Sequence, residues 1–162
     1  MVSLGSITEP DLEYRTVVAV PLSEVWAYVG DPTRTPAWSP VCHQVDWVEG
    51  STAPAVGARF RGHNRLNGIR WTRVCEISAY QPQREIAYST EYNGKESTRW
   101  RYRLREVEGG TEVEESYQIV SVPAWVAFLR ALPGGKKKNV SDAQKNISGS
   151  LERLKAVVEG RV

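Results

Sequence analysis

Glu115 is the residue of this sequence whose type and position point most directly to chemistry. It alternates with Val113 and Tyr117 on one side of a strand-like stretch, whereas Glu112 and Glu114 fall on the other side. The alternation turns the Glu115 carboxyl toward the interior, where loss of water raises a carboxyl pKa unless a partner offsets it. Such a group can move a proton or anchor a polar atom of a ligand.

Two structural roles compete with that interpretation of Glu115. Arg73 also falls on an inward-facing position and would suit an ion pair with the carboxyl, and a tyrosine hydroxyl would suit a hydrogen bond to it. Buried charges are usually paired, which favours a structural role. We name Glu115 and Arg73 as catalytic candidates and leave the catalytic residues otherwise unassigned.

The same alternation turns many aromatic side chains inward. The sequence has six Trp and seven Tyr but two Phe, and Trp and Tyr combine apolar area with a polar atom. We predict a mostly apolar cavity of roughly a few hundred Å3 that binds a small molecule. The predicted ligand-binding residues are Trp38, Phe60, Asn64, Trp71, Tyr88, Trp100, Tyr102, Glu115, Tyr117, Ile147 and Leu151. A filled core is the alternative, although each buried Trp or Tyr would then need a hydrogen-bond partner.

Other catalytic and cofactor patterns are missing from the sequence. His63 falls on a basic outer face, and His43 has no further ligands at metal-binding spacing. No serine lies in a nucleophile elbow, and no glycine-rich loop precedes a helix in the manner of a phosphate site. We therefore predict neither a metal nor a cofactor.

The elements that position these residues begin with a run of strands. Residues 42 to 121 alternate with period two, and Asn67-Gly68, Asn93-Gly94 and Gly109-Gly110 supply tight turns between successive strands. Short turns between neighbours indicate an antiparallel sheet. The last two strands place arginines opposite glutamates on the outer face, namely Arg99, Arg101, Arg103 and Arg105 against Glu112 and Glu114.

A long helix over residues 140 to 158 is the natural cover for the apolar face of that sheet. Its stripe, at spacings of three and four, consists of Val140, Ala143, Ile147, Leu151, Leu154 and Val158. Ser141 with Gln144 is typical of a capping box, and Gly160 of a stop. The lysines at positions 136 to 138 are interpreted as a solvated link before it.

The remaining elements lie at either side of the strand run. Residues 12 to 20 alternate as a first strand; Ser23 is predicted to cap a short helix, and Asp31-Pro32 starts another. Pro123 opens a helix whose Trp125, Phe128, Leu129 and Leu132 share one face. The predicted fold is α+β: a curved antiparallel sheet of about seven strands wrapped around one long C-terminal helix, with two short helices after the first strand.

Length and composition place further bounds. The 162 residues predict a single domain, and the 41% hydrophobic and 25% charged content is ordinary for a globular protein. A net charge of +2 argues against nucleic acid. No apolar run reaches the length of about 18 residues that a membrane span needs, so stable membrane insertion is not expected. Without a visible signal peptide, and with Cys42 and Cys75 expected as free thiols, we predict a cytoplasmic protein.

Several local motifs resemble one known superfamily. They are Pro21, Val25-Trp26, Asp31-Pro32, Trp38-Ser39-Pro40, Gly57-Ala58-Arg59-Phe60, Trp100 with Tyr102, and Gly110-Thr111 with Val113, Glu115 and Ser116. With the order of elements, they resemble the helix-grip fold of the START and birch-pollen-allergen superfamily (SRPBCC), in its polyketide cyclase/dehydrase and lipid-transport branch. The resemblance covers residues 12 to 159. The resemblance implies one of the functions found in this superfamily, which includes carriers of lipids and steroids, aromatase/cyclases and oxygenase domains. It provides no shared catalytic signature.

Three functions follow, in order of preference. The first is a module that binds a small hydrophobic ligand, lipid-like, aromatic or polyketide-like, between sheet and helix. The second is a polyketide cyclase or dehydratase in which Glu115, Arg73 and tyrosines polarise a carbonyl or move a proton. The third is a protein whose open sheet face meets another chain; a homodimer is left open.

Overall fold

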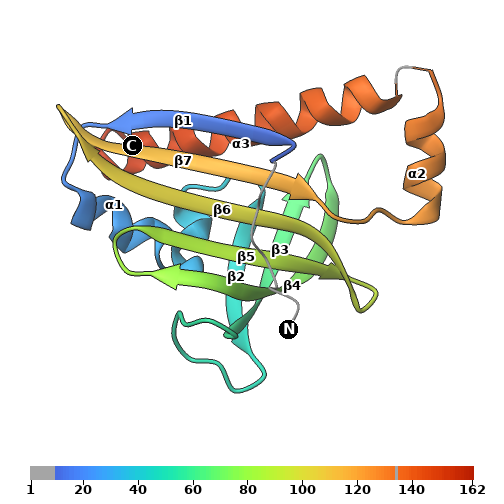
Figure 1. Cartoon of the computed structure of the whole chain (residues 1–162), viewed down its shortest axis with the longest axis horizontal. Coiled ribbons are helices and arrows are strands. Elements are labelled where there is room, and N and C mark those ends of the chain that lie inside the picture. Colours follow the sequence, from blue (N-terminus) through green and yellow to red (C-terminus); the bar gives the residue numbers. More distant parts are fainter. Residues whose placement is uncertain (1–9, 134) are drawn as a thin grey trace.

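The structure is a computed structural model that describes residues 10–133 and 135–162, and of residues 135–143 only the backbone. Seven strands form one antiparallel sheet in the order β1-β7-β6-β5-β4-β3-β2 (Figure 1). The strands are β1 Leu12–Val18, β2 Cys42–Val48, β3 Arg59–Leu66, β4 Ile69–Gln81, β5 Glu85–Tyr92, β6 Lys95–Val107 and β7 Gly110–Ile119. Each of β3 to β7 pairs with the strand before it, and β1 closes the order beside β7. The predicted seven-stranded antiparallel sheet is confirmed.

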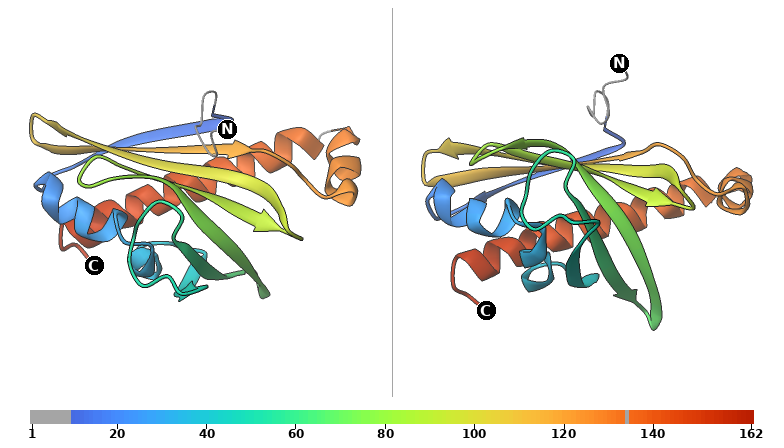
Figure 2. Two further views of the ribbon diagram at one scale, coloured as in Figure 1. Left: turned by 60° about the horizontal axis from the view of Figure 1, so that its bottom comes forward. Right: turned by 90° about the horizontal axis from the view of Figure 1, so that it is seen from below.

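The described helices are α1 Leu22–Val29, the 3-10 helix η1 Pro32–Ala37, α2 Ala124–Ala131 and α3 Gly135–Val158. Three of these four lie on one side of the sheet, and α2 lies beyond its end (Figure 1 and Figure 2). Figure 2 shows α3 running along the concave side of the curved sheet, with α1 and η1 on that same side. The helix-grip arrangement predicted from the sequence is therefore confirmed.

The apolar stripe of α3 holds it against the sheet. Ile147, Leu151 and Leu154 are at most 2% exposed, and Leu151 and Leu154 join a core with residues of the sheet and α1. Val158 packs at the edge of that core. The side chains of Val140 and Ala143, the other predicted members of the stripe, lie outside the described residues.

Two predicted helix starts are wrong. α3 begins at Gly135 rather than at residue 140, so the lysines at 136 to 138 belong to the helix and Ser141 is not its cap. Lysine is a good helix former and no proline interrupts this stretch, so nothing stops the helix from extending backward. α1 begins at Leu22, which places Ser23 inside its first turn. The predicted cap at Asp31 is confirmed, because its side chain accepts a hydrogen bond from the Thr33 amide.

The outer face of the sheet carries the predicted cross-strand charges. Arg105 lies opposite Glu112 with a nitrogen–oxygen distance of 2.9 Å, and Arg101 bonds Glu114 at 3.5 Å. Arg103 pairs instead with Glu85 of β5 at 2.6 Å. These pairs agree with the register of β6 and β7, which in turn fixes the residues that point inward.

Leu151→Ala tests how far α3 depends on its stripe. Because Leu151 is fully buried, we expect its truncation to lower the free energy of unfolding by about 2–5 kcal/mol, measured by urea denaturation. Glu152→Ala truncates the exposed side chain next to Leu151. It is the control and should change stability little. A loss below about 1 kcal/mol for Leu151→Ala would contradict the packing described here.

Candidate functional site

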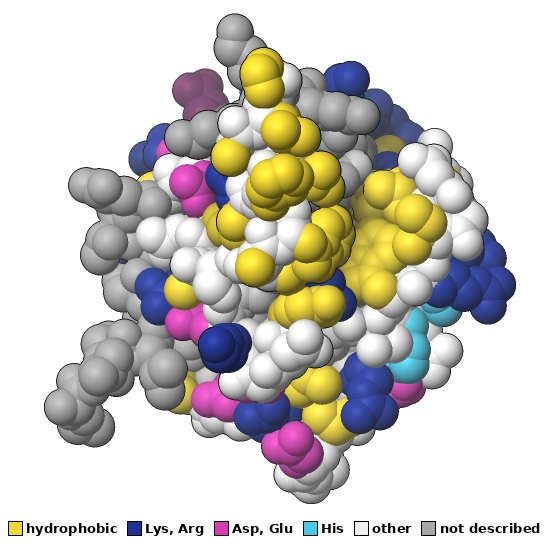
Figure 3. Space-filling model, turned by 90° about the vertical axis from the view of Figure 1, so that its right-hand side faces the viewer, with side chains coloured by type: hydrophobic (Ala, Val, Ile, Leu, Met, Phe, Trp, Pro, Cys, Tyr) yellow, Lys and Arg dark blue, Asp and Glu magenta, His cyan; other side chains and the backbone are white. Residues whose placement is uncertain are grey.

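A cavity of about 360 Å3 lies between the sheet and α3. Every predicted ligand-binding residue except Leu151 lines it. The walls also include residues that were not predicted, namely Thr35, Ser39, Pro40, Val41, Cys42, Val45, Gly62, Cys75, Thr90, Ser97, Thr98, Asn146 and Ser150. Figure 3 looks onto the end of the molecule where a hollow with apolar walls opens beside a column of apolar side chains. The structure thus brings the predicted residues together, and their role in binding stays a prediction.

The aromatic wall follows from strand register. Tyr88 lies opposite Trp100, and Trp100 lies opposite Tyr117, so one inward-facing row crosses β5, β6 and β7. The rings of Trp100 and Tyr117 are 4.6 Å apart between centroids. Phe60 meets Tyr88 edge to face at 5.2 Å. These contacts form a continuous aromatic surface for a flat or branched apolar molecule.

Two predicted site residues have other roles. Leu151 is buried in the core and does not line the cavity, because Ile147 and Ser150 occupy the part of α3 that faces it. Arg73 does line the cavity, but it forms no ion pair with Glu115, whose carboxyl contacts Tyr102 and Ser150 instead. Its guanidinium donates to the Thr72 carbonyl at 2.9 Å and lies 4.8 Å over the Tyr92 ring. Arg73 is on β4 and Glu115 on β7, three strands away, which is about 14 Å at the usual strand spacing.

Glu115 is instead held by hydroxyl groups. It is 1% exposed. The Tyr102 hydroxyl donates to its Oε1 at 2.8 Å, and Ser150 Oγ lies 3.2 Å from its Oε2. Burial raises the pKa of the Glu115 carboxyl to about 8, and the two hydrogen bonds only partly oppose that rise. The predicted alternative of a tyrosine partner is the one that the structure shows.

The hydroxyl protons around Glu115 indicate which protonation state of its carboxyl fits this geometry. The single Ser150 hydroxyl proton has two acceptors in reach, the Ile147 carbonyl at 2.9 Å and Glu115 Oε2 at 3.2 Å. When it goes to the nearer carbonyl, the serine oxygen turns a lone pair to Glu115. A proton on Oε2 then completes the contact, so the neutral acid satisfies every group.

A second tyrosine lies beside this network. The Tyr88 ring lies beside that of Tyr102, with 6.4 Å between centroids, and burial is the main cause that raises both phenol pKa values. Both tyrosines line the cavity. Ser150, Glu115 and Tyr102 are thus linked by hydrogen bonds, and the Tyr88 ring packs beside Tyr102.

Trp38 offers a hydrogen-bond donor without an acceptor. Its side chain lines the cavity at the end of η1 and packs edge to face on Tyr102, with 5.8 Å between ring centroids. The indole nitrogen is buried and has no hydrogen-bond partner among the described residues. A buried N–H without a partner is costly, so an acceptor from a ligand or a water would stabilise this position.

Thr90 and Thr98 form a further polar spot in the wall. Their hydroxyl oxygens are 2.5 Å apart, and Trp100 Nε1 donates to Thr98 Oγ1 at 3.2 Å. The alternation of inward and outward residues could have identified both threonines as wall residues, because they share the inward face of Tyr88 and Trp100. Ser150 could also have been found, since it stands three residues after Ile147, at a spacing typical of the apolar stripe.

Neither a cluster of metal ligands nor a membrane-spanning helix occurs among the residues that the structure describes. Within residues 10–133 and the described side chains of α3, no three His, Cys, Asp or Glu side chains converge as metal ligands would. His63 bonds Asp46 at 2.8 Å, away from the cavity walls. None of the helices in the described part of the chain is long and apolar enough to cross a membrane.

Comparisons agree with this architecture. The family described as polyketide cyclase/dehydrase and lipid transport matches residues 9–159. A polyketide-cyclase-like protein from Corynebacterium glutamicum is 30% identical, with a TM-score of 0.58 over 91% of this chain and 88% of that one. The Zhui aromatase/cyclase from Streptomyces sp. R1128 is 19% identical, with a TM-score of 0.70 over 93% of each chain. Ara h 8.0201 is 18% identical, with a TM-score of 0.65 over 92% of this chain and 97% of that one. No curated protein matches significantly.

The pH dependence of stability tests the environment of Glu115. The folded protein keeps the carboxyl proton up to its raised pKa of about 8, whereas the unfolded chain releases it near 4.5. Stability should therefore fall as pH rises between these two values, by about 1.4 kcal/mol per pH unit. Urea denaturation across this window measures the slope.

Glu115→Gln should remove the part of the pH slope that Glu115 causes. At the acidic end of the window it should lower the free energy of unfolding little, because Gln has nearly the shape of the neutral acid. Glu112→Gln, which removes a carboxyl from the outer face of the same strand, should leave the slope intact. Equal slopes in the wild type and Glu115→Gln would show that Glu115 does not titrate in this range.

Proposed function

We propose, since this chain belongs to the polyketide cyclase/dehydrase and lipid transport family, that it binds one small and mostly apolar molecule in the cavity between the sheet and α3. The observation that carries this proposal is the cavity itself. Its volume of about 360 Å3 falls in the range of about 300–1,000 Å3 found for small-molecule sites. Its walls combine aromatic rings with a few fixed polar groups, as such sites do.

The polar groups suggest what the ligand carries. The Trp38 indole N–H has no acceptor among the described residues, and the network of Ser150, Glu115 and Tyr102 is neutral in the form that fits its hydrogen bonds. Such groups suit a ligand with an uncharged oxygen acceptor, a carbonyl or a hydroxyl. A carboxylate beside Glu115 would meet no cation, because Arg73, the one basic residue among the described cavity walls, lies on β4, three strands away from β7.

A second candidate function is a cyclase or dehydratase in the same cavity. The specific observation that favours it is a buried carboxyl whose pKa, raised by burial to about 8, lies near neutral pH. General acid–base groups work best when their pKa is close to the operating pH. Glu115 would protonate a carbonyl or departing hydroxyl of the ligand, and the tyrosines would hold that oxygen in place. If the protein is such an enzyme, Glu115→Gln should abolish turnover while ligand binding persists. If it is a carrier, the same variant should keep both its ligand binding and its fold.

Filling the cavity tests the binding proposal without removing a wall. Gly62 lies on β3 in the cavity wall, and a Cβ placed there would meet only Cys42 Sγ, at 3.8 Å. Gly62→Leu should therefore project its side chain into the cavity without displacing the backbone. We expect the variant to remain folded and to bind the neutral fluorescent probe N-phenyl-1-naphthylamine at least about tenfold more weakly, since the probe and the new side chain compete for one space.

Gly149→Ala is the matched control. Its Cβ would meet no atom within 4 Å, and residue 149 does not line the cavity. Probe affinity should match that of the wild type. Unchanged affinity in a folded Gly62→Leu protein would mean that the probe binds elsewhere and that the cavity is not the ligand site.

A further inference from the structure

The helix α2 presents its large apolar side chains to solvent. Trp125 and Phe128 are 63% and 67% exposed, and Leu129 and Leu132 are 49% and 46% exposed. Trp125, Phe128 and Leu129 share one face of the helix by their spacing, and Leu132 is the residue that follows its end. A helix on the surface of a globular protein normally turns such a face inward, and here the partly buried positions are Val126 and Arg130 instead. The apolar face of α2 is thus uncovered.

A second uncovered apolar group lies on the turn between β3 and β4. Leu66 and Ile69 are paired across this hairpin and are 37% and 66% exposed. Among the described residues, ten large apolar side chains are exposed, and seven of them are these two, the three of α2 together with Leu132 just after it, and Val120 just before it. Exposed apolar groups gathered in this way mark a binding surface.

Both apolar groups border the mouth of the cavity. Asn64 of β3 and Trp71 of β4 line the cavity and pair with each other. Each lies two residues from the exposed pair at the hairpin tip. On the other side, Ser97 lines the cavity and its carbonyl accepts from the Val120 amide at 2.8 Å, which ties the start of the α2 segment to the mouth. Figure 3 shows α2 as an apolar column directly beside the hollow.

Positive charge at this end is not neutralised. Arg65 and Arg70 flank the exposed hairpin tip, Lys95 follows the neighbouring turn, and Arg130 lies on α2. None of the four forms an ion pair among the described residues, whereas the arginines of the outer sheet face do. The sequence adds three lysines at positions 136 to 138. Apolar side chains rimmed by unpaired cations are complementary to a lipid surface with anionic headgroups.

We propose that this end of the protein docks reversibly on an anionic phospholipid bilayer, with the apolar faces of α2 and of the β3–β4 turn entering the headgroup boundary. The cavity mouth then faces the bilayer, so an apolar ligand passes between membrane and cavity without crossing water. Docking of this kind needs no helix that spans the membrane, and it does not depend on which ligand the cavity takes.

Vesicle sedimentation with the full-length protein tests this proposal. The protein should sediment with vesicles of phosphatidylcholine mixed with phosphatidylglycerol, much less with phosphatidylcholine alone, and less as salt rises. Phe128→Glu should lower the partition coefficient at least about tenfold, the loss expected for one buried aromatic side chain. Arg70→Gln should lower it about fivefold, the contribution of one cation near an anionic surface.

Two variants serve as controls. Val56→Glu changes a side chain of nearly the same exposure as Phe128, 66% against 67%, in the loop before β3 and far from the β3–β4 turn. Arg84→Gln removes an exposed arginine that has no ion pair among the described residues, at the β4–β5 turn. Both should bind vesicles as the wild type does. Thermal melts establish that all variants are folded, and Trp125→Ser replaces Phe128→Glu if the latter unfolds.

Three results would overturn the proposal. They are absence of binding to the mixed vesicles, equal binding by Phe128→Glu and Val56→Glu, and a wild-type dimer that Phe128→Glu converts to a monomer without any vesicle binding. The last, measured by light scattering, would assign this face to contact between two copies of the chain.

Discussion

Glu115 accepts a hydrogen bond from Tyr102 of β6 and lies against Ser150 of α3, and this contact ties the sheet to the long helix through a buried carboxyl. No cation among the described residues neutralises it. A buried carboxyl in such a place is stable only when its hydrogen bonds are complete and its charge is suppressed. The fold therefore imposes two conditions on its interior: α3 must keep Ser150 at this position, and the space around Glu115 must remain apolar.

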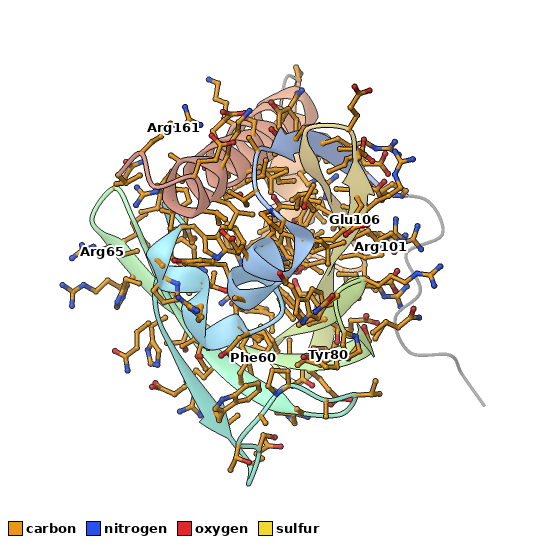
Figure 4. All side chains as sticks on the ribbon, turned by 90° about the vertical axis from the view of Figure 1, so that its left-hand side faces the viewer. Phe60, Arg65, Tyr80, Arg101, Glu106 and Arg161 are labelled. Carbon is orange, nitrogen blue, oxygen red and sulfur yellow. The ribbon has the colours of Figure 1, made fainter. Side chains whose placement is uncertain are left out.

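The cavity exists because the apolar stripe of α3 covers only part of the sheet. Leu151 and Leu154 fill the space near α1, and Figure 4 shows side chains crowding the interior at that end of the molecule. Toward its start the helix becomes polar: Asn146 lines the cavity, and Gln144 and Lys145 are exposed. Because the described side chains at 144 to 146 include no large apolar group to fill the concave face, the aromatic row of Tyr88, Trp100 and Tyr117 faces the cavity.

Much of this could be predicted from the sequence, because alternation and turn residues act locally. They predicted the strands and the inward positions, and all but one of the predicted ligand-binding residues line the cavity, although many wall residues were not predicted. The ion pair of Glu115 with Arg73 could not be judged that way, since it depends on how many strands separate β4 from β7. Helical spacing could have placed Ser150 on the inward face of the helix, but its contact with Glu115 depends on how the helix lies against β7. For α2, spacing indicated an apolar face, but only the three-dimensional arrangement shows that nothing covers it.

Whether the cavity holds a molecule is the central question, and native mass spectrometry of the full-length protein answers it most directly. The protein is purified without detergent and measured before and after incubation with a cellular lipid extract. We expect a one-to-one complex whose extra mass is that of a single small molecule, released intact on collisional activation. A protein that shows only the mass of the bare chain in both samples would contradict the account.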